Sequence, residues 1–361
     1  MQRPSFRRHA RRRSRGFCLL NIGHNSGRTT TDVRTLREIL NGYRNPSSLR
    51  SIAEVAISAI PLVALWATAW LAYRLGHPWA SLLIAVPAAG FLLRLFMIQH
   101  DCGHGAFFPD RRVNDWIGRV IGVITLTPYD LWRRTHAIHH ATSGNLDRRG
   151  IGDVDTLTVR EYRMRSRWGR LKYRLYRHPL VMFGIGPAYL FFLQHRLPIG
   201  LMRAGWQPWL STMATNLAIV SVVAALAWLI GLKAFLFVHL PIVLLAAAIG
   251  VWLFYVQHQF EHTTWDEERE WSLPEAALFG SSHYDLPPWL RWFTANIGVH
   301  HVHHLCSRIP YYRLSQVLRD HPELCSVSRV TLLESLGCVR LVLWDETKRR
   351  LVTFREAEAS C

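Results

Sequence analysis

The sequence predicts an all-α integral membrane protein, with four transmembrane helices in two hairpins and a helical cap on one side of the membrane. Half of the 361 residues are hydrophobic and only 19% are charged, a mixture that favours membrane spans joined to a polar portion. Three tight histidine clusters lie at the end of an apolar stretch or within the polar segments. The apolar stretches predict the spans, and the histidines predict a site in the cap.

Four apolar stretches are long enough, or nearly long enough, to cross a bilayer. They cover about residues 53–74, 79–98, 209–231 and 234–256. Short turns at residues 76–78 and 231–233 separate the members of each pair. Turns this short force the helices of each pair to run antiparallel, so both outer ends of each hairpin lie on the same side.

Basic residues place that side in the cytoplasm. Flanking Lys and Arg stay cytoplasmic, and residues 1–50 contain twelve Arg against Asp32 and Glu38. The segment between the hairpins, residues 111–203, is also rich in Arg. Both termini and the histidine clusters are therefore expected in the cytoplasm. The net charge of +18 fits basic loops facing an anionic leaflet, so no nucleic-acid partner is expected.

The chain is expected to divide into three parts. These are a basic cytoplasmic N-terminal tail (1–50), a membrane domain (51–320) and a cytoplasmic C-terminal tail (321–361). The Arg-rich residues 7–15 resemble a charged leader, but the apolar run that follows, residues 17–20, is too short for a signal-peptide core. We interpret this stretch as a disordered basic tail; a start codon assigned too far upstream is the alternative.

Eight of the nineteen histidines form the three clusters. They are His100 and His104, then His136, His139 and His140, then His300, His303 and His304. Residues three and four apart share a helix face, so these spacings aim imidazoles at one point. Imidazole suits iron, copper and zinc, and eight ligands exceed the three or four protein ligands of one zinc site. Two metal ions are therefore expected, with all eight histidines as catalytic ligands.

Other residues near the clusters are candidates for the same site. His258 and His262 lie one turn apart at the end of the fourth apolar stretch and are predicted as added metal ligands. His301 is expected behind the ligands or on the surface, because about 100° per residue turns it away from His304.

Metal-bound imidazoles usually donate their other N–H group to a carboxylate or carbonyl oxygen. Each candidate acceptor could instead be a helix cap or a surface group. The candidates are Asp101, Asp153, Asp155, Glu261 and Asn296.

The chemistry that such a site permits is oxygen activation. Iron held by imidazoles with open positions can bind dioxygen and form an oxidant that removes hydrogen from an unactivated carbon, whereas zinc has no redox chemistry. A site just below the bilayer suits a lipid whose chain enters an apolar tunnel. The expected cofactors are two iron ions with dioxygen as co-substrate, and the expected substrate is a long hydrocarbon chain.

At these clusters the sequence resembles the membrane fatty acid desaturase family, whose pattern is a His pair followed by two His-x-x-His-His boxes. The first box is His-Asp-Cys-Gly-His at 100–104, and the second is His-Ala-Ile-His-His at 136–140. Residues 298–305 form the third box, followed by Arg-Ile-Pro-Tyr at 308–311. Together the boxes resemble the acyl-lipid omega-6 (delta-12) branch more than the acyl-CoA delta-9 branch. The resemblance runs from about residue 50 to about residue 320.

The resemblance implies a cytoplasmic di-iron cap and the introduction of a cis double bond, with water as co-product. Relatives draw an extra ligand from the end of the fourth span, which supports His258 and His262. An external electron donor of the ferredoxin or cytochrome b5 type is implied, because the His-Pro-Gly-Gly motif of a fused cytochrome b5 domain does not occur in the sequence. The acyl chain is then carried by a membrane lipid or a thioester.

Three alternatives remain open. A hydroxylase or ketolase of the same architecture, acting on an alkane, sterol or carotenoid, shares the hydrogen abstraction, and the boxes do not distinguish it. A regulatory relative without a substrate is the second. The third is a histidine-rich membrane metal transporter, but a transporter should place polar residues near the bilayer midplane, whereas these histidines gather at span ends and in polar segments.

Overall fold

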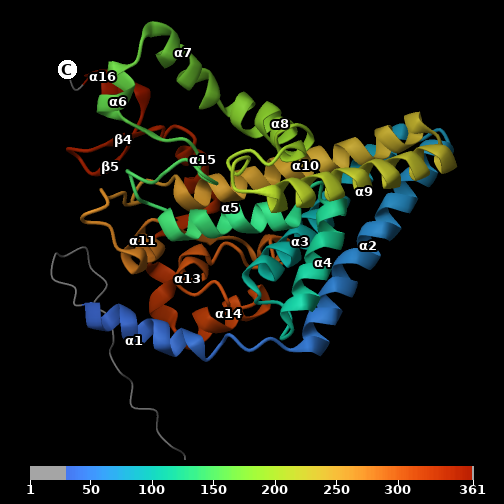
Figure 1. The fold of residues 1–361 in the computed structure, drawn as a ribbon, viewed down its shortest axis with the longest axis horizontal. Helices are drawn as coiled ribbons and strands as arrows, with labels where there is room; N and C mark the ends of the chain where they lie inside the picture. The colour runs from blue at the N-terminus through green and yellow to red at the C-terminus, as the bar shows by residue number, and fades with distance from the viewer. Residues whose placement is uncertain (1–29, 360–361) are drawn as a thin grey trace, which may run out of the picture.

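A computed structural model describes residues 30–359, and these residues are mostly helical (Figure 1). The Arg-rich stretch at 7–15, expected as a disordered tail, lies outside the described residues. Four long helices extend together to one side of the molecule, and the shorter elements gather at the other.

The four long helices are long and apolar enough to cross a membrane, which confirms the four predicted spans. They are α2 (Ser48–Arg74), α3 (Pro78–His104), α9 (Trp206–Ile230) and α10 (Leu232–His258). Helix α3 packs against α2 and α10. More than half of its apolar segment (56%) is buried, against none of that of α9, so α3 is the central helix and α9 lies on the outside.

Two of these helices run past the apolar stretches that predict the spans. The second and fourth stretches stop near residues 98 and 256, whereas α3 continues to His104, as the spacing of the first box predicts, and α10 continues to His258. Gly105 stops α3 in the left-handed conformation, with φ +65°, which glycine adopts without strain. The first histidine box is therefore held on the last turn of a rigid helix.

Shorter helices make up about half of the remaining described residues. In order they are α1 (Thr30–Asn41), α4 (Arg111–Ile124), α5 (Tyr129–Thr142), α6 (Val159–Met164), α7 (Arg167–Tyr176), the π-helix η1 (Val181–Ile185), α8 (Gly186–Phe192), the 3₁₀ turn η2 (Gln194–Arg196), α11 (Leu273–Phe279), α12 (Pro288–Phe293), α13 (His300–Leu305), α14 (Tyr311–Asp320), the 3₁₀ turn η3 (Pro322–Ser326), α15 (Leu332–Cys338) and α16 (Phe354–Ala359).

Five short strands depart from the all-α prediction. They are β1 (Leu157–Thr158), β2 (His283–Asp285), β3 (Arg329–Thr331), β4 (Leu343–Asp345) and β5 (Arg350–Val352). β4 pairs in parallel with β1 and antiparallel with β5, and β2 pairs in parallel with β3. Strands of two or three residues are too short to show an alternating pattern, so hydrophobic periodicity does not predict them.

The segments expected as tails contain packed structure. Leu36 and Leu40, one turn apart on α1, are buried in the main core. Near the other end, the carbonyl of Leu341 accepts a hydrogen bond of 2.9 Å from Arg177, a buried side chain that also bonds Tyr255 on α10 at 3.0 Å. The segment around Leu341 is thereby attached to the end of α10, one turn before His258.

Candidate metal centre

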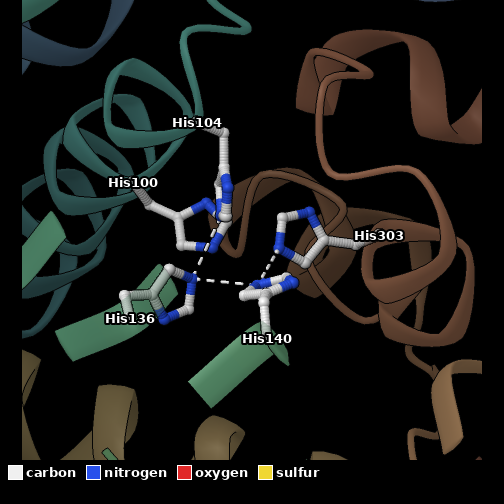
Figure 2. Close-up of side chains that lie close together, drawn as sticks. All are labelled: His100, His104, His136, His140 and His303. Atoms are coloured by element: carbon white, nitrogen blue, oxygen red, sulfur yellow. Dashed lines mark hydrogen bonds between the residues drawn. The ribbon is translucent and has the colours of Figure 1, made fainter. Parts of the chain in front are cut away.

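Five histidines from three helices form the first group (Figure 2). They are His100 and His104 on α3, His136 and His140 on α5, and His303 on α13. One ligand nitrogen from each lies within 4.8 Å of all the others. Nε2 of His136 lies 3.1 Å from Nε2 of both His104 and His140, and Nε2 of His140 lies 3.1 Å from that of His303. Helix α5 thus brings the first and third boxes together.

Four buried histidines form the second group: His139, His258, His300 and His304. Nε2 of His258 lies 3.1 Å from Nε2 of His139 and 3.0 Å from Nε2 of His300. Nε2 of His304 lies 3.1 Å from that of His300. The end of α10 therefore supplies a residue that completes a second cluster with members of the second and third boxes.

Hydrogen bonds alone do not satisfy these nitrogens. Nε2 of His136 faces two other Nε2 atoms, and one ring nitrogen either donates its single proton or accepts with its single lone pair. The same holds for His258, and Nε2 of His100 is buried and has no hydrogen-bond partner among the residues that the structure describes. A metal ion at the centre of each group accepts all the lone pairs at once, so both groups fit a metal.

The spacing of the nitrogens also fits a shared metal ion. Two ligands bound to one ion at about 2.1 Å lie roughly 3 Å apart when they are neighbours, and the neighbouring nitrogens of both groups are 3.0–3.1 Å apart. Each group is therefore compact enough for its members to bind one ion together.

Burial favours the protonation state that binds metal. It lowers the pKa of His136, His140, His300, His303 and His304 well below the ordinary histidine range, and the neighbouring histidines lower it further. These imidazoles are therefore neutral at pH 7, with a lone pair available for a metal.

Three acceptors orient histidines in the groups. Nδ1 of His100 donates to Asp101 at 3.1 Å, Nδ1 of His139 donates to Asp153 at 2.6 Å, and Nδ1 of His258 donates to the carbonyl of Gly280 at 3.1 Å. A proton held on Nδ1 leaves the lone pair on Nε2, where the other histidines converge. The structure thus brings two of the predicted carboxylates, Asp101 and Asp153, to histidines of the groups.

The other candidate acceptors have different surroundings. Asn296 bonds the carbonyl of Tyr311 at 3.2 Å and the hydroxyl of Ser315 at 2.6 Å. The backbone N–H of Asp155 donates to the hydroxyl of Tyr176 at 3.0 Å, and Glu261 is exposed. Among the described residues, none of these three side chains makes a hydrogen bond to a histidine of either group.

His262 and His301 lie outside both groups. His262 was predicted from its position one turn beyond His258, but α10 ends at His258 and the chain leaves the helical path at Gln259 (φ −116°, ψ 74°). Its side chain is exposed. His301 is buried, and its Nε2 donates to the carbonyl of Leu324 at 3.0 Å. Burial lowers the pKa of His301 to about 3, so it is a neutral, buried residue that belongs to neither group.

The third box is held by a close backbone approach that spacing alone does not reveal. The backbone N–H of Tyr284 on β2 donates to the carbonyl of Gly298 at 2.7 Å. A Cβ atom at Gly298 would lie 2.4 Å from the carbonyl oxygen of Tyr284, so only glycine fits. Gly298 precedes α13 by two residues, so this close approach fixes where the helix that carries His300 begins.

Comparison with known proteins identifies the family. The model of the fatty acid desaturase family matches residues 77–334. A fatty acid desaturase of Bacillus subtilis (strain 168) is 43% identical over 322 residues, which cover 89% of this chain and 91% of that protein. More distant relatives include an sn-1 oleoyl-lipid 12-desaturase of Anabaena variabilis, 28% identical over 66% of this chain and 67% of that protein. An sn-1 acyl-lipid omega-3 desaturase (ferredoxin) of Synechocystis sp. is 29% identical over 61% of each chain.

Four candidate membrane spans and two histidine groups that could each hold a metal ion are the features of a metal-dependent membrane oxidoreductase. The chain belongs to the fatty acid desaturase family. It is therefore an enzyme, a fatty acid desaturase, and the resemblance seen in the histidine boxes is confirmed.

Proposed function

We propose that this desaturase introduces a cis double bond into a lipid-linked acyl chain, with delta-12/omega-6 selectivity, by an oxygen-dependent di-iron reaction. The observation that carries the proposal is the pair of histidine groups with nitrogens 3.0–3.1 Å apart. The pattern of the boxes and the similarity to a 12-desaturase support the bond position. The acyl carrier in this proposal is a membrane lipid, with an acyl-thioester as the alternative.

The proposed ligands are nine histidines in two sets. His100, His104, His136, His140 and His303 hold one iron ion, and His139, His258, His300 and His304 hold the other. His262 has no place in this proposal, because its exposed side chain lies in neither group. The ligand nitrogens of each set converge on one point.

The proposed arrangement in the membrane is two hairpins, α2 with α3 and α9 with α10, below a cytoplasmic cap. Both groups include the last residue of a span, His104 on α3 and His258 on α10, which supports a site at the membrane surface. The basic residues before α2 and between α3 and α9 support a cytoplasmic position for the termini and the histidines.

The proposed reaction breaks one C–H bond on each of two adjacent carbons and forms a C=C bond. Dioxygen is reduced to two water molecules; two of the four electrons come from the acyl chain and two from an external donor, with two protons from solvent. Iron held by the two sets of histidines would supply the chemistry that reduces dioxygen and removes the two hydrogen atoms. A donor of the ferredoxin or cytochrome b5 type is proposed.

The chain's own residues prepare this site. Asp101 and Asp153 hold the Nδ1 protons of His100 and His139, so the ligand nitrogens keep their direction. All four histidines of the second group are buried, which excludes bulk water from that half of the site. Exclusion of water protects a reactive intermediate from side reactions.

The direct test is the fatty acid profile of a host that expresses the protein, measured by gas chromatography and mass spectrometry. The proposal predicts a new diene with the wild type and with the control variant His262→Ala, and none with His139→Ala. Unchanged acyl chains beside an oxygenated lipid would identify a hydroxylase instead. A diene made by an iron-replete His139→Ala protein would contradict the ligand assignment.

A further inference from the structure

A cavity of about 710 Å³, with several charged side chains in its lining, lies beside the first turn of α2, and none of the histidines of the two groups lines it. Its lining comes from α2, α3, α12, α14 and the two paired strands β2 and β3. Five arginines line it against two carboxylates, which leaves three positive charges in excess. The arginines are Arg50, Arg94, Arg291, Arg319 and Arg329, and the carboxylates are Glu54 and Asp285.

Each carboxylate of the cavity lies between two arginines. Glu54 pairs with Arg50 at 2.6 Å and with Arg94 at 2.6 Å. On the other side, Asp285 pairs with Arg291 at 2.9 Å and with Arg329 at 2.7 Å. A guanidinium has five N–H donors, and one carboxylate cannot occupy those of two arginines. Arg94 is buried and uses all three of its nitrogens, on Glu54, Ser58 and the carbonyl of Trp292. The donors left for a ligand therefore belong to the more exposed arginines of the wall, above all Arg50 and Arg329.

The position of the cavity indicates what reaches it. Arg50 is the third residue of span α2, and its neighbour Leu49 is 79% exposed. Helix α12 contributes Trp292 to the lining and carries Trp289, which is 64% exposed. Exposed Leu and Trp side chains at the end of a span lie at the level of the lipid headgroups. In the membrane arrangement proposed above, the cavity therefore opens at the level of the lipid phosphates.

We propose that this cavity binds the phosphate of a membrane phospholipid. Guanidinium groups bind phosphate through paired N–H···O bonds, and the volume is that of an ordinary small-molecule site. The binding site stands apart from the iron chemistry proposed above.

The cavity nevertheless has a direct connection to the first histidine group. The Tyr311 hydroxyl donates to Glu54 at 2.9 Å, and the Tyr311 backbone N–H donates to Asp101 at 2.7 Å. Asp101 in turn accepts from His100. Tyr311, which lines the cavity, therefore joins the proposed phosphate site to Asp101, the carboxylate that orients His100.

The test is native mass spectrometry of the full-length protein in detergent, titrated with dihexanoyl phosphatidylglycerol. The variant is Arg319→Gln combined with Arg329→Gln, since both side chains are exposed at the cavity rim. The matched control is Arg160→Gln combined with Arg269→Gln, two exposed arginines outside the cavity. Loss of a charge-assisted hydrogen bond weakens binding about tenfold for each arginine. The control should bind as the wild type does.

Two further probes separate the possible sources of the anion. Dihexanoylglycerol, which lacks the phosphate, should not bind, and inorganic phosphate should compete only weakly. Phosphate that binds as tightly as the lipid would show a free-anion site and overturn the proposal. Equal binding of the uncharged lipid, or unchanged binding by the cavity variant, would overturn it as well. Iron content and melting temperature of the same samples show separately whether the metal centre and the fold are intact.

Discussion

The two histidine groups differ in composition and in exposure. The first has five histidines, all from the three boxes, and three of them are only partly buried; the second has four, all buried, and one, His258, lies outside the boxes. Each His-x-x-His-His box is shared: His136 and His140 go to the first group and His139 to the second, whereas His300 and His304 go to the second and His303 to the first. The partners four residues apart stay together, because they share a helix face.

This division gives His258 the largest expected effect among the residues outside the boxes. His258→Ala leaves the second group with three ligands, so we expect iron to fall from two ions per chain to one. Activity should fall more than about 100-fold, beyond the range typical of residues that only orient a ligand. Inductively coupled plasma mass spectrometry and the diene yield measure the two quantities. His262→Ala is the matched control and should keep two iron ions per chain and the full diene yield. Loss of iron and activity in His262→Ala, with both kept in His258→Ala, would show that His262 is the ligand instead.

The carboxylates that orient one ligand of each group should have the next largest effect. Asp153→Asn and Asp101→Asn should each lower iron affinity or activity by about 10–100-fold. Asp153 should matter more, because its bond to His139 is 2.6 Å, against 3.1 Å for Asp101 and His100. Competition with a coloured iron chelator measures the affinities. Equal, wild-type affinities in both variants would show that the carboxylates do not orient the ligands.

Acid should destabilise the metal-free protein through the buried second group. Burial lowers the pKa of His300 and His304 in the folded chain, while the unfolded chain has the ordinary value of about 6.5. Below about pH 6.5 the unfolded state therefore binds more protons, and the free energy of unfolding falls as the pH falls. Melting temperatures of the metal-free protein at pH 8 and pH 5.5 measure this. With iron bound, the fall in the free energy of unfolding should begin at a lower pH, because protons must first displace the metal from the histidines. A melting temperature of the metal-free protein that rises on acidification would contradict this prediction.

The smallest effect on activity is expected at His301, which lies in the third box but in neither group. His301→Ala removes the hydrogen bond to the buried carbonyl of Leu324, so the free energy of unfolding should fall by about 1–3 kcal/mol. Iron content should stay at two per chain, because no ligand is lost. Urea unfolding and metal analysis of the same sample measure both. Loss of one iron ion in this variant would place His301 among the ligands.

Spacing and hydropathy were enough to predict the spans and the residues that gather. Each of the eight box histidines lies in one of the two groups, and the four predicted spans are present. Spacing did not predict which histidine belongs to which group, because that depends on how α3, α5, α10 and α13 pack against one another. It also did not separate His258 from His262, because the end of α10 between them has no Gly or Pro signal.

Contacts made by the backbone were also beyond the sequence pattern. The carbonyl of Gly280 accepts from His258, and any residue type has such a carbonyl. The strand pairing of β1 with β4 joins segments about 185 residues apart, which local periodicity cannot register. The C-terminal segment was therefore expected as a tail, although it packs beside the end of α10.

The central claim is that two iron ions, one in each histidine group, make this protein a desaturase. The most direct measurement reconstitutes the metal-free protein with increasing iron and records iron per chain and diene formation in each sample, with an electron donor supplied. The claim predicts that activity saturates at two iron ions per chain and that zinc at the same loading gives none. Full activity at one iron ion per chain, or with zinc, would contradict it.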